Sequence, residues 1–320
     1  MPLRALSLFL LLLTAACTAE DQSEKLQIAV IPKGTTHEFW KSVHAGAETA
    51  AQELGVEVIW KGPLIESDRN AQIQVVEDFV TRGVDGVVLM PLDRVALVRP
   101  AREAQQAGIP VIIADSDLDW DGRLSFVATD NKEGGRMGGE KLAELIGGEG
   151  KVILMRYLEN SASTTRREEG FLEAMAAHPG IEVVSSNQYA GPTIEGAQQT
   201  AENLLNSFSE VDGIFAPCES AAYGMMRAIQ DAGRREQIKF VGFDGSEKLV
   251  AGLAAGQVDA LVLQSPIAIG ELSVRAMVQH LSGEDVDPRI DTGVVIATPS
   301  NMNDDEIQAL LSPDLSILGE

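Results

Sequence analysis

Cysteine, aromatic residues and positive charge are all scarce in this chain of 320 residues. Two cysteines cannot build a disulfide scaffold. Only 25 Lys and Arg residues stand against 48 Asp and Glu residues, which gives a formal net charge of −23. A charge this negative repels phosphate backbones, so the composition argues against nucleic-acid binding. The hydrophobic fraction of 45% is too high for a disordered chain, and the length allows two domains.

Motifs of metal and nucleophile chemistry are also missing from the sequence. The four histidines are scattered, and none belongs to an H-E-x-x-H pattern. There is neither a G-x-S-x-G elbow nor a phosphate loop that ends in G-K-[ST]. Asp117, Asp119 and Asp121 alternate as in a calcium loop, but its twelfth position is Ala128, so a solvated acidic loop is favoured. We expect no enzyme, no cofactor and no metal.

The first 17 residues have the pattern of an export signal. Arg4 supplies a positive start, and the apolar run 6–13 is too short to span a bilayer. The small residues before Cys17 resemble the bacterial lipobox, although Thr14 stands where Leu is preferred. We expect a lipoprotein-type signal peptide over 1–17, lipidation of Cys17 and a tether over 18–25, with plain secretion as the alternative.

From residue 26 onward, short apolar runs alternate with segments of helical period. On the helical segments Ile73, Val76 and Phe79 share one face. This alternation predicts an α/β fold with doubly wound parallel sheets. The predicted strands are 27–31, 56–60, 86–90, 111–114 and 125–128, followed by 151–155, 182–185, 213–216, 239–242 and 260–263.

The two halves of the body resemble each other. The sequence VDG at 84–86 returns at 211–213, and the strand and aspartate at 110–115 return at 239–244. The offsets are nearly equal, so we expect two similar Rossmann-like lobes. Open parallel sheets bind ligands beyond the carboxyl ends of their strands, so two facing sheets predict one interlobe cleft that closes on a small molecule by a hinge.

Several short motifs in a fixed order resemble those of periplasmic sugar-binding proteins of the ribose and galactose type, the receptors of ABC importers. The likeness covers about residues 26–298. It rests on Glu38-Phe39-Trp40, Gly83-Val84-Asp85-Gly86, Thr129-Asp130-Asn131, Gly170-Phe171, Gly242-Phe243-Asp244-Gly245 and Gln264-Ser265-Pro266. It implies a monomer that captures a monosaccharide or polyol and delivers it to a membrane permease. A sensor feeding a chemoreceptor or histidine kinase, and a binder of a non-sugar molecule, stay open.

The resemblance also implies a three-strand hinge. Its crossings fall at Thr129 and Asp130, at Gln264 and Ser265, and near Asp291. Lobe one is then expected over 26–129 plus 265–291. Lobe two is expected over 130–264 plus 292–320.

The candidate ligand-binding residues combine flat aromatic rings with polar groups at strand ends. The rings of Phe39 and Trp40 can pack on the C–H patches of a sugar. The resemblance places sugar-binding carboxylates at Asp115 and Asp244, each of which can accept hydrogen bonds from two hydroxyls. Gln264 offers both a donor and an acceptor.

The resemblance puts an Arg ligand near the start of the helix before Gly170. Thr165 occupies that position and Arg166 follows it, so Arg166 is our candidate, whereas Arg167 is expected to form structural ion pairs. The remaining candidates are His37, Met90, Cys218 and Glu219. At these positions the sequence departs from the pentose-binding pattern, so the resemblance does not imply that ribose is the ligand.

Overall fold

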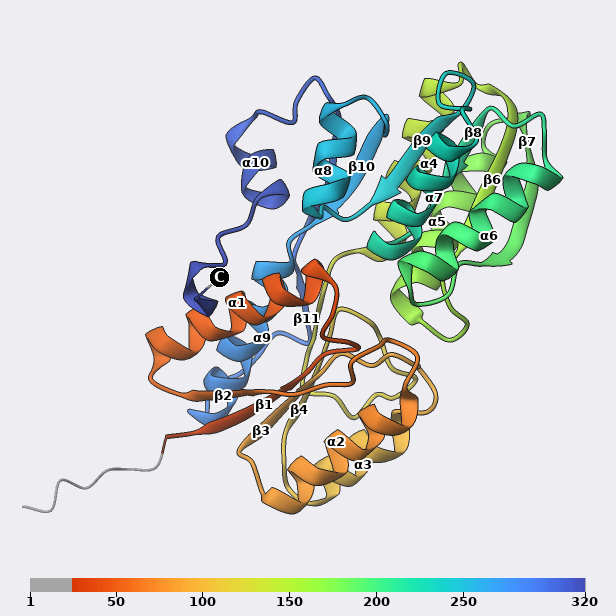
Figure 1. The fold of residues 1–320 in the computed structure, drawn as a ribbon. Coiled ribbons are helices and arrows are strands. Elements are labelled where there is room, and N and C mark those ends of the chain that lie inside the picture. The colour runs from red at the N-terminus through yellow and green to blue at the C-terminus, as the bar shows by residue number, and fades with distance from the viewer. Residues whose placement is uncertain (1–24, 320) are drawn as a thin grey trace, which may run out of the picture.

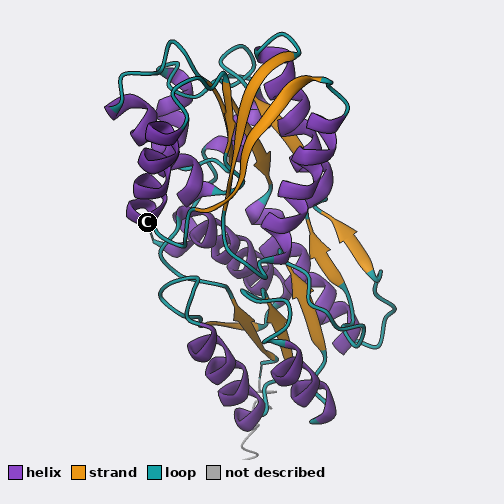
Figure 2. Cartoon of the chain, turned by 90° about the vertical axis from the view of Figure 1, so that its right-hand side faces the viewer, coloured by secondary structure: helices purple, strands orange, loops and turns teal. Residues whose placement is uncertain are grey.

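The computed structural model describes residues 25–319, which form two α/β lobes (Figure 1). The export signal, Cys17 and residues 18–24 of the predicted tether lie outside the described residues. Each lobe has one sheet of six strands with helices on both faces (Figure 2). The predicted fold class is confirmed.

The sheet of lobe one is wholly parallel and runs β2-β1-β3-β4-β5-β11. Alternate residues of each strand face opposite sides, so Ile28 and Val30 pack under α1 and α9 while Ala29 and Ile31 pack under α2 and α3. The strands are β1 (Gln27–Ile31), β2 (Glu57–Trp60), β3 (Gly86–Leu89), β4 (Val111–Ala114), β5 (Phe126–Ala128) and β11 (Arg289–Asp291). The helices are α1 (Glu38–Leu54), α2 (Arg69–Arg82), α3 (Val98–Gln106) and α9 (Pro266–Leu281).

The sheet of lobe two runs β7-β6-β8-β9-β10-β12, and only its edge strand β12 is antiparallel to its neighbour among the described pairings. The strands are β6 (Glu149–Arg156), β7 (Gly180–Tyr189), β8 (Gly213–Phe215), β9 (Lys239–Phe243), β10 (Ala260–Gln264) and β12 (Val294–Ala297). Helices α4 (Asn131–Leu145) and α5 (Ala162–Ala176) cover one face. The other face is covered by α6 (Ile194–Ser207), α7 (Glu219–Asp231) and α8 (Glu247–Ala254).

The chain passes between the two sheets three times. It leaves β5 for α4 at Thr129 and Asp130, leaves β10 for α9 between Gln264 and Ser265, and leaves β11 for β12 after Asp291. The hydroxyl oxygens of Thr129 and Thr292 lie 3.1 Å apart, which joins the first and third of these segments.

The C-terminal residues differ from the lobe assignment made from the sequence. Helix α10 (Asp305–Leu311) packs on β10 of lobe two, but the last turn, η1 (Ser316–Leu318), contacts α1 of lobe one. Pro313 follows the end of α10, and a residue before proline disfavours the helical conformation. The chain therefore leaves lobe two and returns across the cleft.

Glycines bring the helices of each lobe into direct backbone contact. A Cβ atom on Gly46 or on Gly270 would collide with the facing backbone of the α1–α9 pair. Gly135 and Gly170 have the same relation in the α4–α5 pair. The close packing fixes the position of α5, which carries Arg167 into the cleft.

Candidate ligand-binding site

The two halves of the site begin at aspartates that share an uncommon backbone conformation. Asp115 follows β4 and Asp244 follows β9, with φ angles of 58° and 71°. Residues other than glycine seldom adopt this region, and Asp and Asn do so most readily. Both side chains are buried. Each lobe therefore presents a carboxylate at the end of a strand, where the two sheets face each other.

A small cavity lies between these strand ends and is lined by both lobes. Eight of the eleven predicted ligand-binding residues line it, namely His37, Phe39, Trp40, Asp115, Cys218, Glu219, Asp244 and Gln264. The fold thus brings together residues more than 200 positions apart in the sequence.

In lobe two, Asp244 is the centre of a hydrogen-bond network. Its Oδ1 accepts from Gln264 Nε2 over 2.7 Å, and its Oδ2 accepts from the backbone N–H of Glu219 over 3.0 Å. Burial raises the pKa of Asp244, although Arg167 and these hydrogen bonds oppose the rise. Gln264 Oε1 is buried and has no hydrogen-bond partner among the described residues, so it is a free acceptor at the cavity.

Arg167, which the sequence suggested as a structural residue, is the arginine that reaches the cavity. Its Nε donates to Asn131 Oδ1 over 2.7 Å and one terminal nitrogen donates to the Pro217 carbonyl over 2.9 Å. Its guanidinium carbon lies 3.9 Å from the ring centroid of Phe243, and one terminal nitrogen lies 3.9 Å from Asp244. These contacts fix the planar group beside the Asp244 carboxylate.

In lobe one, two ion pairs border the cavity. Lys33 Nζ lies 2.8 Å from Asp115 Oδ2, and His37 Nδ1 lies 2.8 Å from Glu66 Oε1. Burial opposes ionisation of both His37 and Glu66. Their mutual hydrogen bond and opposite charges outweigh it, raising the pKa of His37 to about 9 and lowering that of Glu66 to about 2. Both groups are therefore charged near neutral pH.

Contacts across the cleft show the lobes in a closed arrangement. Tyr157 of lobe two donates its hydroxyl to Glu66 Oε2 over 2.7 Å, and Lys33 donates to Ser163 Oγ over 2.9 Å. The backbone N–H of Phe39 donates to Glu219 Oε2 over 3.1 Å. Burial raises the pKa of Glu219 to about 7, although the charge of His37 and the Phe39 hydrogen bond favour the carboxylate.

Sequence reasoning missed several residues of the cavity wall, which are Lys33, Glu66, Tyr157, Ser163, Thr164, Arg167 and Ser220. For two of these residues the sequence did contain a signal. Lys33 follows β1 closely and Tyr157 directly follows β6, so both stand at carboxyl ends of strands, as the predicted aspartates do. Glu66 lies in the longer loop after β2 and carried no comparable signal.

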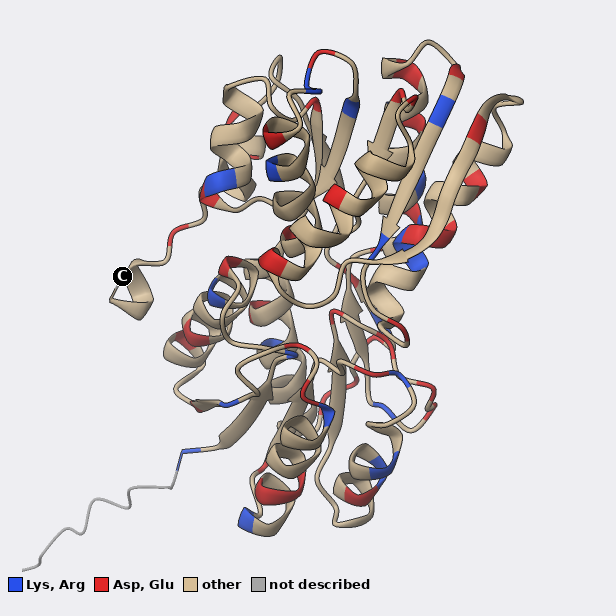
Figure 3. Cartoon of the chain, turned by 45° about the vertical axis from the view of Figure 1, so that its right-hand side comes forward, with Lys and Arg blue, Asp and Glu red and all other residues tan. Residues whose placement is uncertain are grey.

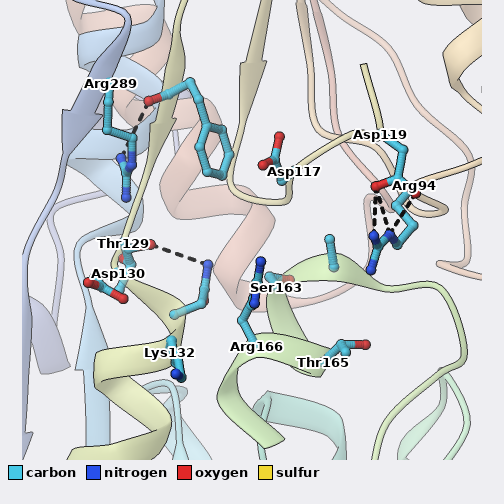
Figure 4. A pocket seen from close by; sticks show the side chains of 13 residues that line it. Arg94, Asp117, Asp119, Thr129, Asp130, Lys132, Ser163, Thr165, Arg166 and Arg289 are labelled. Atoms are coloured by element: carbon cyan, nitrogen blue, oxygen red, sulfur yellow. Dashed lines mark hydrogen bonds and ion pairs between the residues drawn. The ribbon is translucent and has the colours of Figure 1, made fainter. Parts of the chain in front are cut away.

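Three predicted residues do not line the cavity. Met90 is fully buried in the apolar cluster beneath α1 and α9. Thr165 and Arg166 line a separate opening between the lobes, near Asp130 (Figure 4). Arg166 is paired with Glu169 over 2.8 Å. Successive residues of a helix are rotated by about 100°, so α5 turns Arg167 towards the cavity and the residue before it away.

Two further tryptophans and the acidic loop after β4 make structural contacts. Trp60 stacks on His44 with ring centroids 4.5 Å apart, and Trp120 packs in the apolar cluster of α2 and α3. Asp117 pairs with Arg123 over 3.2 Å. Within residues 25–319 no group of three or more His, Cys, Asp or Glu side chains is placed to hold a metal ion.

Two facing α/β lobes with a polar cavity at the hinge define a binding protein that closes around a small molecule. The family model described as the periplasmic binding protein domain matches residues 28–285, and the chain belongs to this family. It is a solute-binding protein of the ABC-importer type, as its motifs predicted. The family consists of substrate-binding transport proteins and implies export to the periplasm.

Similar proteins cover almost the whole chain. The ribose import binding protein of Escherichia coli K12 is 30% identical over 274 residues, 85% of this chain and 90% of that protein. The D-allose-binding periplasmic protein of the same organism is 31% identical, over 79% and 83%. The carbohydrate transporter solute-binding protein of Agrobacterium radiobacter in complex with D-arabinose has a TM-score of 0.87 and 32% identity, over 90% of this chain and 99% of that one.

Acidic and basic residues are distributed along both lobes (Figure 3). No helix within residues 25–319 has both the length and the apolar character needed to cross a membrane.

Proposed function

We propose that this chain captures a neutral monosaccharide or polyol in the interlobe cavity and delivers it to a permease without transforming it. The proposal rests on two buried carboxylates, Asp115 and Asp244, which lie at equivalent strand ends, one in each lobe. The free acceptor of Gln264 lines the same cavity. A sugar presents many hydroxyl donors within a small volume, and buried acceptors of this kind need such donors.

The charges around the cavity favour a neutral ligand. Lys33, His37 and Arg167 are balanced by Asp115, Glu66 and Asp244, while Glu219 titrates near neutral pH. A sugar acid or a sugar phosphate would add an uncompensated negative charge to a desolvated space, which is strongly unfavourable.

One aromatic ring is placed to stack on the ligand. The rings of Phe39 and Trp40 meet edge to face, with centroids 4.8 Å apart and an interplanar angle of 83°. Only one of two perpendicular rings can lie flat on a sugar. Trp40 is buried and donates its Nε1–H to Glu66 over 2.8 Å, so we assign the stacking role to the more exposed Phe39.

The proposal also includes a hinge between the lobes and a lipid anchor at the N-terminus. Closure takes place about Thr129 and Asp130, Gln264 and Ser265, and Asp291, and the lobes are 26–129 plus 265–291 and 130–264 plus 292–312. The closed form is what the permease receives. Lipidation of Cys17, supported by the small residues that precede it, would tether the protein to the membrane beside that permease.

The test is a thermal-shift and titration panel of the sugars found in similar structures, which are D-arabinose, D-fucose, D-tagatose, D-allose and myo-inositol. A ligand at 100 times its Kd stabilises the fold by about 2.7 kcal/mol and raises the Tm. Sugar acids and sugar phosphates serve as charged controls and should give no shift. If no neutral sugar or polyol shifts the Tm, while an amino acid or nucleoside does, the proposed ligand class is wrong.

A further inference from the structure

Glu66 stands between two separate spaces of the closed cleft. It lines the ligand cavity. It also lines a second interlobe space of about 400 Å³, whose walls include Leu92 of lobe one and Leu158 and Tyr189 of lobe two. The Glu66 side chain is therefore part of the partition that separates the two spaces.

Three hydrogen bonds hold this partition in place. Glu66 Oε1 accepts from Trp40 Nε1 and lies 2.8 Å from His37 Nδ1, both in lobe one. Glu66 Oε2 accepts from the Tyr157 hydroxyl of lobe two over 2.7 Å. Hydrogen bonds to an ionised carboxylate are short and strong, so the side chain is fixed from both lobes at once.

Tyr157 completes the partition only when the lobes are closed. It directly follows β6, its ring is buried with 2% of its surface exposed, and it lines the ligand cavity. Its neighbour Leu158 lines the second space. The bond between Tyr157 and Glu66 thus crosses the cleft where the two spaces would otherwise join.

We propose that Glu66 and Tyr157 are specificity-determining residues that limit the ligand to a single sugar ring by closing one end of the cavity. The inference rests on the proposed function. A substituent on the sugar at this end would have to break a buried, charge-assisted hydrogen bond to enter the second space. Six of the nine residues that line that space are polar or charged, and the other three, Leu92, Leu158 and Tyr189, offer apolar surface on which such a substituent can pack once the partition is open.

The experiment compares parent sugars with extended ones. D-arabinose and D-allose are titrated by calorimetry against their benzyl glycosides and against benzyl ethers of their terminal hydroxyl, so that either end of the ring is tested. The wild type should bind the parent sugar about 100 times more tightly than any benzyl derivative. We define the affinity ratio as the affinity for the parent sugar divided by the affinity for its benzyl derivative. In Tyr157→Ala the affinity ratio should fall by about tenfold or more for one class of derivative, because the second space becomes available.

Tyr189→Ala is the matched control. It removes the same side chain from the same lobe and enlarges the second space without opening the partition, so the ratio should stay at the wild-type value. Far-UV circular dichroism and the Tm check folding. If Tyr157→Ala does not fold, Glu66→Ala opens the partition from lobe one and should lower the ratio in the same way.

Two results would overturn the inference. The first is a wild type that binds a benzyl derivative as tightly as the parent sugar. The second is a folded Tyr157→Ala or Glu66→Ala variant with an unchanged ratio. Both results leave the proposed function standing, because the parent sugar still binds. A wild type that binds no parent sugar contradicts the proposed function itself, and this inference falls with it.

Discussion

Gln264 donates its side-chain amide to Asp244 over 2.7 Å, and the next residue in the chain starts the other lobe. Gln264 is the last residue of β10, whereas Ser265 caps α9 by accepting from the backbone N–H of Ala268. One hydrogen bond therefore joins a carboxylate of the cavity to a segment that connects the lobes. A ligand that engages Asp244 and the free Gln264 oxygen acts directly on the hinge.

Replacing Gln264 by Leu should weaken ligand binding by about 10- to 100-fold. The change removes a donor to a buried carboxylate together with the free acceptor, and hydrogen bonds to charged groups contribute about 1.5–3 kcal/mol. Titration calorimetry with the best sugar of the panel measures the change. Gln198→Leu, on α6 and outside the cavity wall, is the control and should bind as the wild type does. Equal affinities for the two variants would contradict the role given to Gln264.

Asp115→Asn and Asp244→Asn should each lower the affinity by at least about tenfold while the protein stays folded. Asn tolerates the left-handed backbone of both positions, so the substitution removes charge without adding strain. The measurement is calorimetry, accompanied by urea unfolding. Asp78→Asn, at an exposed position of α2, controls for the loss of one negative charge. Undiminished binding by both cleft variants would show that the aspartates serve only to shape the turns.

Stability should fall as the pH rises from about 4.5 to about 7, in part because of Glu219. Burial raises the pKa of Glu219 from 4.5 to about 7, so the folded state holds its proton more tightly than the unfolded state does. The stabilising contribution is complete below pH 4.5 and is lost as the pH passes through 7. Glu219→Gln should therefore reduce this slope, measured by urea unfolding across the range.

Other groups shape the same pH profile. Burial also raises the pKa of Glu168 to about 7, so Glu219→Gln should reduce the slope but not abolish it. The His37 pKa of about 9 gives a contribution that is lost between about 6.5 and 9, above the window of Glu219. Glu306→Gln, on the exposed start of α10, is the control. A slope that is the same in both variants and the wild type would exclude ionisation of Glu219 as a cause.

Much of the fold could be predicted because each strand is a short apolar run between turn residues. All ten predicted strands are present, and of the strands within residues 25–319 only the short β11 and β12 beside the third crossing were missed. Strand ends also predicted the cavity aspartates, because the carboxyl edge of a parallel sheet is where its loops gather. Met90 shows the limit of this rule, since it follows β3 but points into the core.

The predictions that failed concern the direction of side chains on a helix and the residues of long loops. Whether Arg166 or Arg167 faces the ligand cavity depends on the rotation of α5, which is set by its glycine contact with α4 and not by sequence spacing. Glu66 becomes part of the site only because Trp40, His37 and Tyr157 converge on it from separate elements. Such three-dimensional convergence leaves no local pattern in the sequence.

Gly170→Ala should destabilise lobe two and impair binding together. A Cβ atom at Gly170 would meet the backbone of Lys132, so α5 must move away from α4. Overpacking of this kind costs about 1–3 kcal/mol, and the shift should displace Arg167 from Asp244. Urea unfolding and sugar titration measure the two effects. Gly196→Ala, on α6, should change both far less, because the added atom would lie 3.2 Å from Thr193 Oγ1 and 3.3 Å from the Ala190 carbonyl oxygen, which small shifts relieve. If Gly170→Ala lowers stability but binds sugar with wild-type affinity, the α4–α5 contact does not position Arg167 for the ligand.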